Sequence, residues 1–183
     1  MLYTLVSADP IPITLDVVKK YMKLTTDKDD QVITDIIEVA VVWGEKYTGK
    51  SFRPHTWNLL LDEFADRMEL RKSLVDAITS VKYLVDASLS TVSSAVYYLK
   101  QGHQFSEVLL AYDQTWPTDA DIIEHAVEII FTTEAYRNPE VIDVGLRKHI
   151  THLYENRGDN DIGSAAKLSG ATFIYDQFTT PRI

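Results

Sequence analysis

The sequence contains no cysteine, no long apolar run and no excess of positive charge. Without cysteine the chain forms no disulfide, no thiolate metal site and no cysteine nucleophile. No apolar stretch approaches the roughly 18 residues that a transmembrane helix needs. Residues 1–5 lack the basic segment and long apolar core of a secretory signal. We therefore expect neither membrane insertion nor export from the cytoplasm.

The formal charge of −9 comes from 18 basic and 27 acidic residues. This balance argues against a protein that wraps DNA, because such proteins gain affinity by neutralising phosphates. It is compatible with a protein that surrounds DNA without gripping it, since a like-charged wall lets DNA slide. A length of 183 residues with 45% hydrophobic composition is typical of one globular domain with a substantial core.

Residues 44–51 match the nucleotide-binding pattern GxxxxGK[ST]. That pattern binds phosphate only as a loop between a buried strand and a following helix. Here the order is reversed, because the preceding apolar residues recur at helical spacing (Val32, Ile33, Ile36, Ile37, Ala40, Trp43 and Tyr47). Gly49 lies where a left-handed residue ends a helix. We predict a helix end here and no phosphate contact by Lys50, with a nucleotide hydrolase as the minor alternative.

The remaining patterns predict an α+β chain with an N-terminal helix pair, an antiparallel β region and a C-terminal helix. The expected helices span about 14–24, 29–48 and 139–157, with Thr14 as N-cap of the first and Pro139 opening the third. Alternation predicts the β region at about 56–132. Its strands are expected at 56–61, 68–71, 80–85, 96–100, 107–111 and 126–132, separated by polar stretches such as 86–94. Residues 1–158 are expected to form a single domain, and residues 159–183 an extended C-terminal arm.

Two groups of residues resemble metal sites. Asp27, Asp29 and Glu38 have the spacing of calcium ligands, but the loop lacks the required glycine and has helical periodicity. His149 and His152 lie at i, i+3 on the last predicted helix, but the HExxH zinc pattern is absent, so a metal hydrolase stays a minor alternative. We therefore predict no catalytic, cofactor-binding or metal-binding residues, and no cofactor.

The order of these elements resembles the head–tail connector (adaptor) proteins of tailed bacteriophages. The resemblance covers roughly residues 10–158, and members of the longer form carry a β insertion between the helices. It rests on Ile13-Thr14-Leu15-Asp16, Asp29-Asp30, Tyr47-Thr48-Gly49-Lys50, Trp57, Thr79-Ser80-Val81-Lys82-Tyr83, Trp116-Pro117 and His152-Leu153-Tyr154-Glu155-Asn156-Arg157.

The resemblance implies a structural virion protein at the head–tail junction, assembled in the host cytoplasm. Such proteins form a ring of about twelve subunits that joins the portal to a tail-completion or stopper protein. Packaged DNA passes through the ring without sequence-specific contact, and no catalytic residues or membrane are involved. A ring subunit needs two different lateral faces that meet heterologously. A different neck or tail-completion protein of the same virion is the alternative.

The segment after residue 158 departs from the family pattern. It is polar at first and then aromatic, with Phe173, Tyr175 and Phe178 as potential anchors. We expect it to act as an arm that docks on the portal or a neighbouring subunit. The alternative, that it packs on its own domain, stays open. Trp43 and Tyr47 continue the apolar stripe of the second helix and are expected in the core or in a subunit contact.

Overall fold

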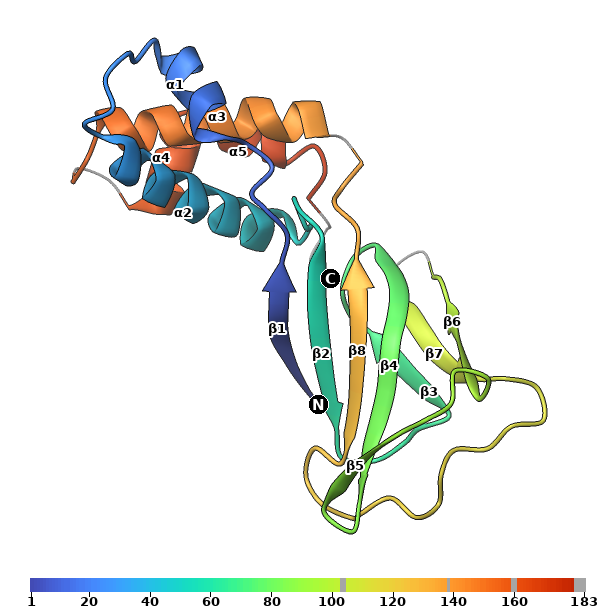
Figure 1. Cartoon of the computed structure of the whole chain (residues 1–183). Coiled ribbons are helices and arrows are strands. Elements are labelled where there is room, and N and C mark those ends of the chain that lie inside the picture. The colour runs from blue at the N-terminus through green and yellow to red at the C-terminus, as the bar shows by residue number, and fades with distance from the viewer. Residues whose placement is uncertain (103–104, 138, 159–160, 180–183) are drawn as a thin grey trace. The chain divides into compact units, whose positions relative to one another are not determined.

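The computed structural model describes residues 1–102, 105–137, 139–158 and 161–179 (Figure 1). The chain divides into two compact units. Residues 1–9 and 54–135 form the β unit, and residues 10–53 and 136–183 form the helical unit. The predicted class, helices combined with antiparallel sheet, is confirmed. The division crosses the expected boundary at residue 158, because the last helices pack within the helical unit.

The helical unit is built from α1 (Leu15–Met22), α2 (Asp30–Thr48), α3 (Pro139–Glu155), α4 (Ile162–Leu168) and α5 (Ala171–Tyr175). The Thr14 side chain caps α1 by accepting the Val17 N–H at 3.4 Å, as predicted. The core joins Val18 of α1, Ile33 and Ile37 of α2, and Leu146 of α3. None of the helices in the described ranges combines the length and apolarity needed to cross a membrane.

The predicted extended arm is wrong, because residues 162–175 form α4 and α5. Asp161 caps α4 by accepting the Ser164 N–H at 3.0 Å. Tyr175 is fully buried and packs against α3 at Gly145, where an added Cβ would lie 2.6 Å from the tyrosine ring. The residues that pack α4 and α5 are mostly small (Ala165, Ala166 and Ala171). Small buried residues leave a weak hydrophobic pattern, which explains why the helices were missed.

The β unit contains β1 (Leu2–Ala8), β2 (His55–Leu61), β3 (Arg67–Leu70), β4 (Val75–Val85), β5 (Ser88–Thr91), β6 (Tyr97–Lys100), β7 (Ser106–Leu110) and β8 (Val127–Thr133). One antiparallel sheet has the order β1-β2-β8-β4-β5, and a second has the order β3-β7-β6. Residues of both sheets share one core, to which the first contributes Leu59 and Ile129 and the second Leu70 and Val108. The strict burial alternation along β8 shows how its period of two selects the core face.

Two strands, β1 and β5, were not predicted from the sequence. β1 is an edge strand that pairs with β2, and most of its side chains are exposed, so burial does not impose alternation. β5 lies in the stretch 86–94, which was predicted to be a polar connection. Val85 pairs with Ser88 across a two-residue turn in which Asp86 and Ala87 both have positive φ, 50° and 58°. Hairpin turns of this geometry usually contain glycine, so the sequence carried no turn signal.

Candidate assembly surfaces

The nucleotide-like segment is the end of a helix. Residues up to Thr48 belong to α2, and Gly49 takes the left-handed conformation at φ 68°. Gly44 lies inside α2, where an added Cβ would lie 2.6 Å from the Phe52 ring. The chain beyond turns back, and Phe52 N–H donates to the Glu45 carboxylate at 2.7 Å. The glycines therefore serve packing and helix termination, and Lys50 lies over the Tyr136 ring at 5.9 Å.

The residues with calcium-loop spacing each have another partner. Lys19 bonds both Asp27 and Asp30 at 2.6 Å, which holds the pKa of Asp27 below its usual value. Tyr154 donates its hydroxyl proton to Asp29 at 2.6 Å and so ties α3 to the start of α2. Glu38 pairs with Arg53 at 2.7 Å. The three carboxylates thus connect elements of the helical unit.

His149 is fully buried in α3. Its Nε2 lies 3.0 Å from the Ile162 carbonyl oxygen, and its ring meets Trp43 edge-on at 5.2 Å between centroids. Burial lowers the pKa of His149, so the neutral imidazole is favoured. Across the described residues no group of three or more His, Asp or Glu side chains is arranged to hold a metal ion. His149 therefore helps to hold the start of α4 against α3.

The five predicted contact residues occupy different environments. Trp43 and Tyr47 stack at 4.8 Å and pack half-buried on the helical core. Tyr47 donates its hydroxyl proton to Asp176 at 2.7 Å. Tyr175 and Phe178 lie inside this core, where burial raises the pKa of Tyr175. Phe173 is 75% exposed and stays a candidate contact residue.

Two rows of exposed valines lie on the helical unit. Val32, Val39 and Val42 lie on one side of α2, and Val141 and Val144 are three residues apart on α3. Val32 shares the apolar periodicity of α2 but is exposed. It lies about 100° around the helix from Ile33, and this rotation separates the exposed row from the core. Apolar rows of this kind mark contacts with other proteins when they are contiguous.

The net charge is concentrated in one unit. The β unit contains five basic and fourteen acidic residues, a formal charge of −9, whereas the helical unit contains thirteen of each. The whole net charge of the chain therefore belongs to the β unit. Sequence reasoning treated the charge as a property of the entire chain. The absence of Lys and Arg from residues 111–126 was a visible signal.

Comparisons with known proteins show which protein family this sequence resembles. The family model of phage gp6-like head-tail connector proteins matches residues 12–85. Over these residues the chain is similar to the head–tail connector proteins. The match begins before α1 and ends at the last residue of β4, so it includes the predicted helix pair and the first strands of the β region. The predicted resemblance is thereby confirmed, and it supports a structural connector protein over an enzyme. No curated protein matches the sequence.

Solved structures share the fold over the full chain. Similar chains occur in the neck of the empty gene transfer agent (GTA) particle computed with C6 symmetry, with a TM-score of 0.74 and 17% identity, and in the virion of the native GTA particle, with 0.73 and 20%. Another occurs in the neck of the native GTA particle computed with C12 symmetry, with 0.70 and 20%. Each match covers 100% of this chain and 97% of the other. At these identities the likeness establishes a common fold.

Proposed function

We propose that this chain is a structural subunit of a virion neck and forms a ring that joins the portal to the tail around the DNA exit channel. The observation that carries the proposal is the connector-family match over residues 12–85, together with the fold shared with neck proteins. The C12 symmetry of one such neck supports a ring of about twelve subunits. In this role the protein is a structural component of the particle and needs no catalytic residue.

The valine rows are suited to the lateral contacts of such a ring. A ring closes when one face of each subunit meets a different face of the next. The row on α2 (Val32, Val39 and Val42) and the row on α3 (Val141 and Val144) are exposed on two different helices and are candidates for the two contact faces. Burial of apolar area contributes about 25 cal/mol per Å², so both rows favour association. Phe173, exposed on α5, is proposed as a contact to the portal or a neighbouring subunit.

The proposal is tested by the assembly state of the purified full-length protein, measured by native mass spectrometry and negative-stain electron microscopy. We expect a closed ring with a central hole. Replacing Val39 and Val42 together by Asp should convert the ring to monomers with an unchanged circular dichroism spectrum. The matched control adds the same charge at Ser94 and Ala95, which are exposed in the β unit, and should leave the ring intact.

A wild-type protein that stays monomeric at all concentrations and on added portal would contradict the ring. A protein that joins particles only after the portal carries another ring would favour the alternative of a different neck or tail-completion protein.

A further inference from the structure

One end of the β unit is rich in carboxylates. We call it the acidic end and define it by three segments: residues 62–66, the turn 86–87 and the loop 111–126. It carries eight acidic residues (Asp62, Glu63, Asp66, Asp86, Asp113, Asp119, Asp121 and Glu124) and no Lys or Arg. Seven of the eight are exposed, and Asp121 is half-buried.

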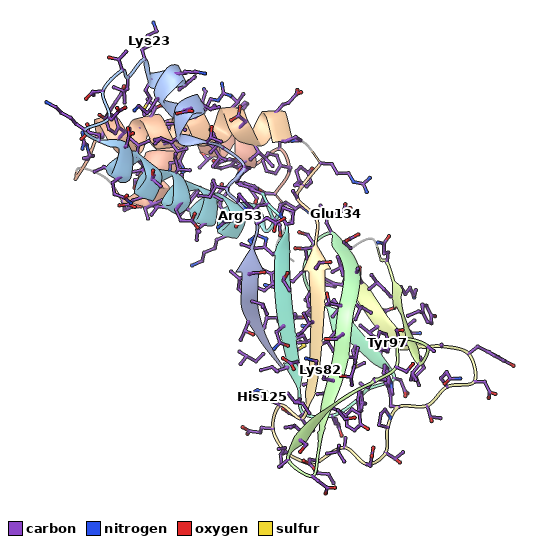
Figure 2. The ribbon with its side chains drawn as sticks, viewed as in Figure 1. Lys23, Arg53, Lys82, Tyr97, His125 and Glu134 are labelled. Carbon is purple, nitrogen blue, oxygen red and sulfur yellow. The ribbon has the colours of Figure 1, made fainter. Side chains whose placement is uncertain are left out.

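The strand register brings the three segments together. Leu61 and Tyr83 both pair with Val127, so the end of β2, the end of β4 and the start of β8 coincide. The loop 111–126 enters this end from β7 and leaves it through β8, as the yellow and light-orange trace in Figure 1 shows. His125, labelled in Figure 2, lies at this end of the sheet.

The long loop is held in place by specific contacts. The Asp121 carboxylate accepts the N–H groups of Asp86 and Ala87 at 3.2 and 3.0 Å, which supports the strained turn. Trp116 stacks on Phe64 at 4.9 Å and donates its indole N–H to the Ala65 carbonyl at 3.1 Å. His125 N–H donates to the Asp62 carboxylate at 3.0 Å. These contacts fix the backbone of the loop, and its remaining side chains project from this fixed backbone.

Large apolar side chains project from this loop. Ile122, next to the anchored Asp121, is 100% exposed, and Tyr112 is 98% exposed. Ile123 is also exposed. Single exposed apolar residues are common on protein surfaces. Their concentration on an anchored, highly charged loop is a feature of binding surfaces.

A shallow groove completes the acidic end. Its lining combines aromatic and aliphatic residues with hydroxyl side chains and one carboxylate (Tyr83, Val92, Val96, Trp116 and Pro117; Thr91, Ser93, Thr115 and Thr118; Asp119). An aromatic wall beside a carboxylate accommodates the aliphatic stem and the cationic head of Lys or Arg. The complementary ligand is thus both cationic and apolar.

We propose that the acidic end is a docking surface for a basic, apolar segment of another virion protein. The inference rests on the proposed neck function. DNA is disfavoured as the occupant because the eight carboxylates repel phosphate. The acidic end of a second copy is disfavoured by the same repulsion. A cationic protein segment satisfies the charge, covers Ile122 and Tyr112, and fills the groove.

The test places a photo-crosslinking amino acid, p-benzoylphenylalanine, at Ile122 of the full chain inside assembled particles. The matched control places it at Leu168, an exposed apolar residue of the helical unit. Irradiation should join position 122 to one different virion protein, through a peptide with net positive charge. Position 168 should not give this product. A second probe at Tyr112 should give the same product, and it replaces the first if the Ile122 variant is not incorporated.

Charge neutralisation provides an independent readout. The variant D113N/D119N/E124Q should lower the cross-linking yield about tenfold, in the range expected for loss of electrostatic attraction. The control D35N/E140Q/E155Q removes three exposed charges from the helical unit and should leave the yield unchanged. Cross-links to this chain, to DNA or to a neutral or acidic peptide would each overturn the proposal, as would no cross-link from either probe. An intact ring with any of these results refutes this inference alone, whereas a protein that stays monomeric even on added portal refutes the proposed function.

Discussion

The two units of this chain differ in their net charge and in the kind of contact that each is suited to make. The helical unit is electrically balanced, with thirteen basic and thirteen acidic residues, and its charged side chains pair with one another, as Lys19 does with Asp27 and Asp30. The β unit has a formal charge of −9 and gathers carboxylates at one end without cations. A neutral unit with exposed valine rows is suited to contact with identical copies. A strongly charged unit is suited to selecting a partner of opposite charge.

The comparison also separates two ways of building a core. The helical unit closes its core with the last helix, through Tyr175 and the rings around it (Trp43, Tyr47, Phe52 and Phe178). The β unit closes its core by packing two sheets, so no terminal segment beyond β1 is needed. Damage to the C-terminal region should therefore affect one unit selectively.

The largest expected effect comes from Tyr175→Ala. Removing a fully buried aromatic ring creates a cavity and should cost about 3–5 kcal/mol of unfolding free energy in the helical unit. Hydrogen exchange followed by peptide should show lost protection in α2, α3 and α5 while β2, β4 and β8 stay protected. The control Phe173→Ala, at an exposed ring, should change stability by less than about 0.5 kcal/mol. Equal destabilisation by both variants would refute the assignment of Tyr175 to the core.

A smaller effect is expected from acidification. Burial lowers the pKa of His149 below the usual value of 6.5 for histidine, so below this pH the unfolded chain binds a proton that the folded chain does not. The unfolding free energy of the helical unit should thus fall as the pH drops below 6.5, by at most about 1.4 kcal/mol per pH unit. Above this range His149 adds no pH dependence.

The measurement is urea unfolding between pH 7.5 and 5.5, with unit-resolved hydrogen exchange as the readout. His149→Gln should remove most of the pH dependence, whereas His125→Gln, at an exposed residue of the β unit, should not. An unchanged slope in His149→Gln would assign the pH dependence to other groups.

The smallest expected effect concerns salt. Self-repulsion among the acidic residues of the β unit is screened as ionic strength rises. Raising NaCl from about 0.02 to 0.3 M should increase the stability of the β unit by a few tenths of a kcal/mol, comparable to one exposed ion pair. The balanced helical unit should gain less. The same unit-resolved hydrogen exchange measures the gain in each unit. A larger gain in the helical unit would contradict the view that the unequal net charge of the two units affects their stability.

Much of the element order was predictable from local signals. Thr14 and Gly49 mark helix ends through capping chemistry, and the alternation before Thr133 marks β8, because these signals depend on neighbours in sequence. The connector family was also recognised from this order. The exposed row of Val32, Val39 and Val42 was predictable only in part, since the buried and exposed sides of α2 are both apolar.

The sequence by itself determined the mixed α and antiparallel β class, the helix end at residues 44–51 and the overall acidity, because periodicity, capping and charge are properties of short segments or of composition. Only the tertiary structure decided that residues 162–178 complete the helical core, since Tyr175 becomes buried through a close approach to Gly145 that no local pattern encodes. It alone also brought eight carboxylates from three separate segments to one end of a sheet, because strand pairing sets which loops become neighbours.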